Sequence, residues 1–138
     1  MGRRRKAREL ALQFLYQLDL SVESDPAPHE AEFWARHPVD EDTRQFACAV
    51  VRGAKANQAR IDQTITECAE HWDLGRMAVV DRNILRLAVW ELLWPAGVPA
   101  KVAINEAIEI AKKFGTHESS RFINGVLDRV HRELSPAS

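Results

Sequence analysis

The chain has 138 residues and a formal net charge of −1, with 46% hydrophobic and 28% charged residues. This length suits one globular domain, residues 1–138, that buries its core without disulfides or metals. No apolar stretch approaches the roughly 18 residues of a membrane span, and no signal-peptide core follows the basic N-terminus. With only Cys48 and Cys68, the sequence has no disulfide framework, so we expect a reducing, cytoplasmic location.

The near-zero net charge hides an uneven distribution along the chain. Residues 1–18 carry five basic groups and one acidic group, whereas residues 19–73 have a net charge of −7 and residues 74–138 a net charge of +2. A short Arg-rich segment is a recognised feature of RNA-binding proteins, although a basic N-terminus can also be simply solvated. The charge pattern therefore indicates a nucleic-acid partner only together with further features.

Apolar residues recur with the 3.6-residue period of a helix, and no period-2 run is visible, so the predicted fold class is all-α. The first helix is expected from about Arg3 to Leu20, with an apolar stripe centred on Phe14. A loop with three prolines should follow over residues 21–39, and Phe33-Trp34 could form a short turn in it.

The apolar pattern in the middle of the chain predicts two helices separated at Asn57. Asp40 or Asp42 can cap the second helix at its N-terminus. The third helix is expected to carry an apolar stripe that continues as far as Trp72.

Three more helices are predicted in the second half. The first runs from about Arg76 to Trp94, and the next begins at Pro99 and ends at Gly115, which supplies a left-handed stop. Thr116 or Ser119 then opens the last helix, and residues 135–138 form a frayed tail. Six helices predict a compact bundle of two packed subdomains, about 1–73 and 74–134.

The first helix carries the most informative pattern. With Phe14 at the centre of the buried face, a rotation of 100° per residue places Arg5, Leu12 and Tyr16 on the opposite side, flanked by Arg8 and Glu9. Exposed apolar groups beside cations are typical of a contact surface, and arginines with aromatic side chains suit single-stranded RNA. The alternative is that Leu12 and Tyr16 pack under the loop.

The same helix contains an electrostatic conflict. Its first turns hold four arginines and one lysine, where the helix dipole already places partial positive charge. Each exposed cation there is unfavourable by a few tenths of a kcal/mol, so a polyanionic partner explains the pattern better than local stability does.

The turn before the last helix and the last helix itself offer a second candidate surface. Lys112, Lys113 and Arg121 place cations around residues 114–118. The pair Asn124-Gly125 interrupts the apolar stripe at a cost of about 1 kcal/mol against alanine. Such a pair predicts a close backbone approach by another helix or by a ligand.

Enzyme motifs are absent: no phosphate-binding loop, dinucleotide fingerprint, nucleophile elbow or zinc-protease helix occurs. Cys68 and His71 could supply half of a metal site, but Cys68 also belongs to the apolar stripe, which favours core packing. Glu106 and Glu109 are expected to be solvated carboxylates on an exposed face. The sequence thus predicts no catalysis, no cofactor and no metal site.

Several segments resemble the NusB family: RRRKARELALQFLY at 3–16, DRNILRLAVWELL at 81–93, VPAKVAINEAIEIAKKFG at 98–115 and ESSRFINGVLDRV at 118–130. The resemblance implies an all-α fold of two helical subdomains. It also implies transcription antitermination, in which the protein binds the boxA element of nascent ribosomal RNA together with NusE, a small-subunit ribosomal protein. The complex would act on RNA polymerase.

The resemblance, together with the cationic turn, assigns site residues. The expected RNA-binding residues lie on the first helix, at the end of the fifth and at the start of the last: Arg3, Arg4, Arg5, Lys6, Arg8, Tyr16, Lys112, Glu118, Arg121, Phe122 and Asn124. The expected NusE-binding residues are Tyr16, Asp81 and Arg82.

Some features depart from the family pattern or leave alternatives open. Ala100 stands where the family suggests an aromatic residue, and the loop over 21–39 is not distinctive. The resemblance also allows a homodimer that buries the RNA surface, and ribosomal RNA methyltransferases carry a similar N-terminal domain. From the residues alone, a purely protein-binding helical module and a metalloenzyme built on Cys68 and His71 remain as rivals.

Overall fold

The computed structural model describes residues 2–70, 72–94 and 98–133. Its elements, in chain order, are α1 (Gly2–Asp19), η1 (Ala27–His29), α2 (Glu30–Arg36), α3 (Glu41–Ala56), α4 (Gln58–Cys68), η2 (Leu74–Arg76), α5 (Val79–Leu93), α6 (Ala100–Phe114) and α7 (Ser119–Glu133). Because the described residues contain helices and no strands, the all-α prediction is confirmed. None of the helices in this part of the chain is both long and apolar enough to cross a membrane.

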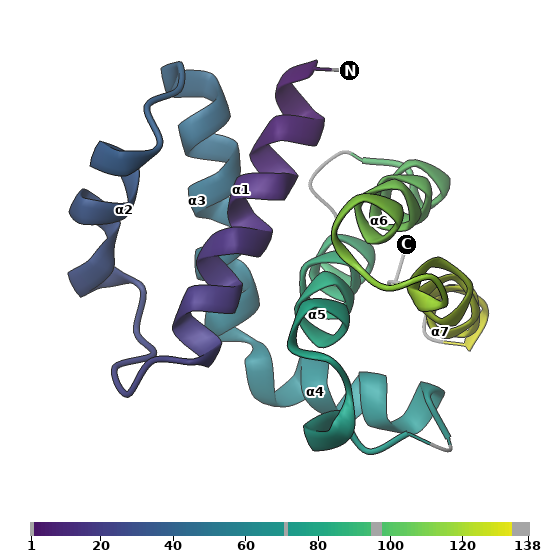
Figure 1. Cartoon of the computed structure of the whole chain (residues 1–138). Coiled ribbons are helices and arrows are strands. Elements are labelled where there is room, and N and C mark those ends of the chain that lie inside the picture. Colours follow the sequence, from purple (N-terminus) through teal and green to yellow (C-terminus); the bar gives the residue numbers. More distant parts are fainter. Residues whose placement is uncertain (1, 71, 95–97, 134–138) are drawn as a thin grey trace.

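Helix α1 occupies a central position in the bundle, between α3 on one side and α5 on the other (Figure 1). Helices α6 and α7 pack on the far side of α5, and α4 lies across the ends of α5 and α7. Since α5 contacts α1 and α3 as well as α6 and α7, the division into two subdomains near Leu74 stays a prediction.

The core contains the apolar stripes that the sequence predicts. Leu10, Phe14 and Leu18 of α1 are fully buried. The ring of Phe14 stacks on that of Phe33, with centroids 4.4 Å apart. The segment 21–39 is therefore more ordered than a loop with a short turn, because Phe33 and Trp34 are buried residues of helix α2.

Helix termini follow local side-chain chemistry. Asp40 caps α3, since its carboxylate accepts hydrogen bonds from the Thr43 backbone N–H at 3.2 Å and from Thr43 Oγ1 at 2.6 Å. Asn57 separates α3 from α4, as predicted, and its Nδ2 donates to the carbonyl of Gly53 at 2.9 Å. The helix expected from Arg76 begins only at Val79, because residues 74–76 form a separate 3₁₀ turn in which Asp73 accepts from the Gly75 N–H.

The structure contradicts the expectation about Gly115 and half of the one about Gly125. Gly115 ends α6 with φ −93° and ψ −170°, which is extended backbone and not the left-handed stop. A side chain there would instead meet the Cβ of Ser119 at 2.6 Å, so Gly115 is needed for the tight turn into α7. Gly125 has no neighbour within 4 Å of a built Cβ, so no other helix in the described part of the chain approaches it closely, and the approach of a ligand stays a prediction. Close packing against a glycine occurs instead at Gly53, which faces the Trp90 ring.

Candidate nucleic-acid interface

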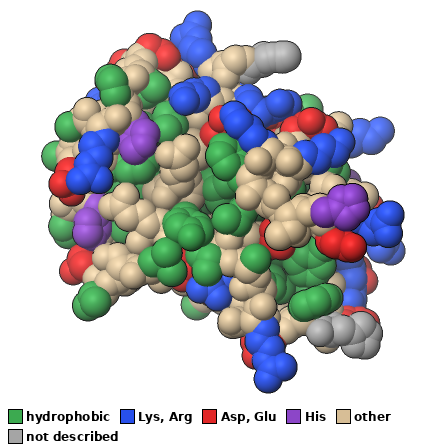
Figure 2. All heavy atoms as spheres, in the orientation of Figure 1, with side chains coloured by type: hydrophobic (Ala, Val, Ile, Leu, Met, Phe, Trp, Pro, Cys, Tyr) green, Lys and Arg blue, Asp and Glu red, His purple; other side chains and the backbone are tan. Residues whose placement is uncertain are grey.

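The N-terminal turns of α1 present a cluster of cations at the surface. Arg3, Arg4 and Lys6 are exposed, and the first turn contains no acidic residue. Lys and Arg side chains gather in the upper part of the molecule around this end of α1 (Figure 2). We call Arg3, Arg4 and Lys6 the terminal cations. They lie where the helix dipole disfavours positive charge.

Carboxylates at the start of α3 face two of the terminal cations. Arg3 Nη1 lies 3.5 Å from Asp40 Oδ2 and 3.8 Å from Asp42 Oδ2. Arg4 Nη1 lies 3.5 Å from Asp42 Oδ2, and its guanidinium also covers the Phe46 ring at 4.3 Å. The ion-paired side chains are all more than half exposed, so these ion pairs are weak and can be exchanged for a phosphate.

Arg5 is held more firmly than the terminal cations. Its Nε and Nη2 donate to the two carboxylate oxygens of Glu106 on α6, at 2.6 and 2.9 Å. The hydrogen bond from Arg5 lowers the pKa of Glu106 below its ordinary value, and the hydrogen bond to Glu106 raises the pKa of Arg5. Glu106 is therefore not the solvated carboxylate that the sequence predicts. Arg5 still exposes about a third of its side chain.

The expected exposure of Arg8 is wrong. Arg8 is buried, and its guanidinium makes two 2.8 Å hydrogen bonds to the carboxylate of Glu91 on α5. Leu12 and Glu9 are buried as well, and the Glu9 carboxylate binds Lys113 of α6 at 3.1 Å. A helical wheel with one buried face leaves these residues exposed, whereas α1 is covered on two sides, by α3 and by α5.

Tyr16 is placed as predicted, on the outer side of α1 with 39% of its surface exposed. Leu20 follows one turn later and is also an exposed apolar residue. The C-terminal end of α1 therefore presents apolar side chains to solvent, at the opposite end from the terminal cations.

The start of α5 binds the end of α1 through a polar network. Arg82 and Asn83 both donate to the carboxylate of Asp19, with Arg82 Nε 2.8 Å from Oδ2, and Arg86 joins Asp19 to Asp62 of α4. Burial alone would raise the pKa of Asp19, but the hydrogen bonds from Arg82 and Asn83 outweigh it and lower the pKa. Arg82 is thus mostly engaged inside the protein.

The start of α7 places most of its predicted residues at the surface. Glu118, Arg121 and Asn124 are exposed, and Phe122 is half-buried against the core. Lys112 is exposed near the end of α6, 3.3 Å from Glu109. Arg121 has no ion pair among the residues that the structure describes.

A hollow of about 430 Å³ joins residues that the sequence assigned to different surfaces. Its lining comes from the segment after α4, the start of α5 and the start of α7: Trp72, Arg76, Met77, Ala78, Asp81, Thr116, Glu118, Ser119, Arg121 and Phe122. It brings Asp81 together with Glu118, Arg121 and Phe122. The sequence does not single out Trp72 as a site residue, because the apolar stripe of the third predicted helix runs on to Trp72, whereas α4 ends at Cys68.

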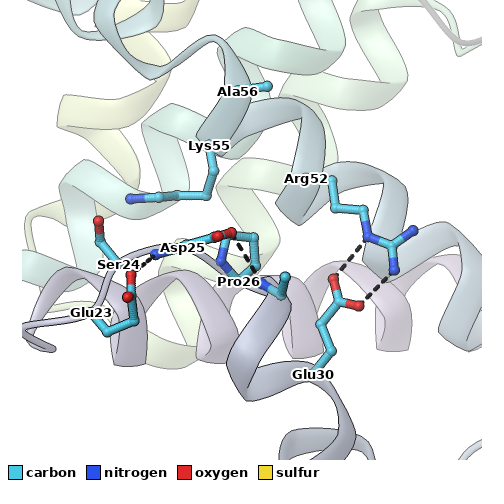
Figure 3. A pocket seen from close by; sticks show the side chains of 9 residues that line it. Glu23, Ser24, Asp25, Pro26, Glu30, Arg52, Lys55 and Ala56 are labelled. Atoms are coloured by element: carbon cyan, nitrogen blue, oxygen red, sulfur yellow. Dashed lines mark hydrogen bonds and ion pairs between the residues drawn. The ribbon is translucent and has the colours of Figure 1, made fainter.

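A second hollow, of about 600 Å³, offers no comparable chemistry. Between the loop after α1 and the end of α3, the Glu30 carboxylate is paired with Arg52 at 2.6 Å and Lys55 approaches from above (Figure 3). Burial lowers the pKa of Lys55, whose Nζ donates to Gln58. Besides the Glu30–Arg52 pair, the carboxylates of Glu23 and Asp25 accept hydrogen bonds from the backbone N–H groups of Asp25 and Ala27. These polar groups are therefore engaged within the protein.

No metal site is found in the described part of the chain, where no three His, Cys, Asp or Glu side chains are grouped to hold an ion. Cys68 is buried, as the core interpretation predicts, and His71 lies outside the described residues. Burial raises the pKa of the Cys68 thiol, which disfavours the thiolate that a metal requires.

Comparisons with known proteins agree on one family. The NusB family model matches residues 5–132. A transcription antitermination protein NusB from Anaeromyxobacter sp. (strain Fw109-5) is 50% identical over 136 residues, covering 97% of this chain and 93% of the relative. The protein of the same name from Koribacter versatilis (strain Ellin345) is 50% identical over 135 residues, covering 96% and 91%.

Solved structures give the same result. NusB of T. maritima superposes with a TM-score of 0.88 at 39% identity, over 99% of this chain and 94% of that one. The crystal structure of antitermination factors NusB and NusE in complex with dsRNA matches with a TM-score of 0.84 at 27% identity, over 96% and 98%. By the family match and by its identity to these relatives, the chain belongs to the NusB family.

Proposed function

We propose that this chain is a transcription antitermination factor that binds boxA-type single-stranded RNA of nascent ribosomal transcripts together with NusE, in the cytoplasm and without catalysis. One observation carries the RNA-binding part: the terminal cations are exposed at the end of α1 where local stability favours acidic residues. A polyanionic partner supplies the missing negative charge.

The terminal cations would bind the RNA backbone. Phosphates replace Asp40 and Asp42 at Arg3 and Arg4, and Lys6 has no ion pair to break among the described residues. Arg5 contributes through the part of its guanidinium that Glu106 leaves exposed. Arg8 does not belong to this surface, because its guanidinium is buried in an ion pair with Glu91 that joins α1 to α5.

The start of α7 would read the bases. Phe122 offers an apolar face for stacking, while Asn124 and Glu118 carry polar groups that can bond base edges. Arg121 and Lys112 are exposed and can neutralise the neighbouring phosphates. Phosphate contacts would then position the strand, and base contacts would provide its sequence preference.

NusE would contact the opposite end of α1 and the start of α5. Tyr16 supplies an exposed aromatic side chain there. Oδ1 of Asp81 is buried without a hydrogen-bond partner among the described residues, so a donor from a partner could satisfy it. Arg82 supports this surface through Asp19. A homodimer that covers the RNA surface remains an alternative state of the free protein.

A gel-shift experiment tests this function. The purified chain is mixed with single-stranded boxA-like RNA, with the same sequence as a duplex, or with a scrambled strand, each with and without NusE. We expect the tightest complex with single-stranded boxA-like RNA in the presence of NusE. Binding of NusE without any RNA binding would instead identify a purely protein-binding module. Equal binding of scrambled and boxA-like RNA would contradict base recognition.

A further inference from the structure

Trp72 is an exposed aromatic residue in a position that packing does not explain. It retains 55% of its accessible surface, although tryptophan is among the most apolar side chains. Its ring makes a T-shaped contact with the ring of Phe122, with centroids 5.5 Å apart and an interplanar angle of 66°. Together the two rings form a small aromatic wall, which we call the Trp72–Phe122 wall.

The backbone on both sides holds this wall in place. The N–H of Trp72 donates to the carbonyl of Ala69 at 2.8 Å, which ties the residue to the end of α4. The N–H of Phe122 donates to the carbonyl of Glu118 at 3.2 Å in the first turn of α7. The wall is therefore formed before any ligand arrives, which lowers the ordering cost of binding.

Two hollows adjoin the Trp72–Phe122 wall. One is the 430 Å³ hollow at the start of α5, and the other, of about 320 Å³, lies between α4 and α7 and includes Gly125. Both are lined by Trp72, Arg121 and Phe122. An aromatic wall between two hollows offers a planar ligand contact with a ring face.

The charges around the 430 Å³ hollow favour a base over a bare anion. Arg76 and Arg121 are exposed and have no ion pair within the described ranges, but Asp81 and Glu118 belong to the same lining. A free phosphate would meet two carboxylates as well as two cations. A nucleobase is neutral, stacks on aromatic rings, and carries its phosphates at a distance that allows them to reach the exposed cations.

We propose that Trp72 is an RNA-binding residue that, with Phe122, holds one nucleobase of a single-stranded RNA, while Arg76 and Arg121 bind the flanking phosphates. The proposal rests on the proposed function and extends its RNA surface from the start of α7 across to the segment after α4. Continuity supports this extension, since Phe122 and Arg121 belong to both parts.

The test couples the protein side chain to a single base. Trp72→Ala and wild type are each titrated, with NusE present, against a set of boxA-like RNAs that carry one abasic nucleotide at successive positions. For wild type we expect one position at which loss of the base weakens binding by roughly 5- to 150-fold, the range of one base stacked on an aromatic side chain. For Trp72→Ala with intact RNA we expect a similar loss, and no further loss from the abasic nucleotide at that position.

Controls separate the outcomes. Val22→Ala, at an exposed apolar residue in the segment after α1, should bind every RNA like wild type, and thermal unfolding should show that Trp72→Ala is folded. If wild type binds intact RNA but Trp72→Ala shows the same abasic profile, this inference is wrong and the proposed function stands. If Trp72→Ala weakens NusE binding in the absence of RNA, Trp72 is a protein contact. If wild type binds none of the RNAs, both proposals fail.

Discussion

Arg8 and Glu91 form a two-hydrogen-bond ion pair between α1 and α5, with both distances 2.8 Å and both side chains only 3% exposed. The pair joins the central helix to the helix that contacts both halves of the bundle. It also explains why the fifth cation in the first turns of the helix does not add to the RNA surface: Arg8 has a structural partner.

Breaking this pair should destabilise the protein strongly. Glu91→Ala leaves the Arg8 guanidinium buried without its partner, so we expect the free energy of unfolding to fall by about 3–5 kcal/mol. Urea unfolding monitored by circular dichroism measures this change. The exposed pair Arg36–Glu32 is the matched control, and Glu32→Ala should cost less than about 0.5 kcal/mol.

A double replacement distinguishes a lost partner from a lost attraction. Arg8→Met combined with Glu91→Leu removes both buried charges and fills the space with apolar atoms, so it should be much more stable than Glu91→Ala alone. A double variant as unstable as the single one would show that the volume of the ion pair, and not its charge balance, decides the cost.

The local features of this fold can be predicted from the sequence, because they depend on neighbouring residues. The Phe14 stripe and the Asp40 cap are examples: helical spacing determines the first, and a carboxylate three residues before an N–H determines the second. Arg8 and Leu12 could not be placed in the same way. They are buried because α1 lies between two other helices. A helical wheel describes one helix alone and does not show how many neighbours cover it.

The candidate site shows the same limit. The exposure of the terminal cations follows from their position at a helix end, so the sequence predicts it. The hollow beside Trp72 and Asp81 depends on where α4 ends and where α5 and α7 begin, and residues from three segments meet there. The sequence signal for this hollow is the apolar stripe that reaches Trp72, and such a stripe favours a buried core residue over an exposed binding residue.

Removing two terminal cations should weaken RNA binding mainly at low salt. Arg3→Ala combined with Lys6→Ala eliminates two phosphate contacts, and each contact to a single strand contributes about 0.7 to the slope of log K against log salt. We therefore expect the slope to fall in magnitude by about 1.4. Fluorescence anisotropy of labelled boxA-like RNA over a range of KCl concentrations gives the slope.

A charge-matched variant controls for the change in net charge. Arg36→Ala combined with Arg132→Ala removes the same charge from α2 and from the end of α7, where both arginines pair with exposed carboxylates of their own helices. Its slope should equal that of wild type. If both double variants lose the same slope, net charge and not the position of the cations controls RNA binding.

Asp42 should compete with RNA for the terminal cations. It lies 3.8 Å from Arg3 and 3.5 Å from Arg4, so these contacts must be broken before phosphates bind there. Asp42→Asn should raise RNA affinity about 2- to 5-fold at low salt, in line with the weakness of exposed ion pairs. Asp128→Asn, an exposed carboxylate near the end of α7, is the control and should leave the affinity unchanged. An unchanged affinity for Asp42→Asn would show that its ion pairs do not oppose RNA binding.

Asp19 should give the protein part of its acid sensitivity. Its pKa is lowered from the ordinary value of 3.8, because the hydrogen bonds from Arg82 and Asn83 outweigh the effect of burial. A carboxyl group whose pKa is lower in the folded state stabilises the fold above its unfolded pKa. This stabilisation is lost as the pH falls below 3.8 toward the folded pKa.

Asp19→Asn should lower the free energy of unfolding by about 1.5–3 kcal/mol at pH 7, because the charged hydrogen bonds to Arg82 and Asn83 are weakened. It should also unfold with a smaller difference between pH 7 and pH 3 than wild type in urea titrations. Parallel pH dependences in the two proteins would show that Asp19 titrates alike in the folded and unfolded states, and that Arg82 and Asn83 do not favour its charged form.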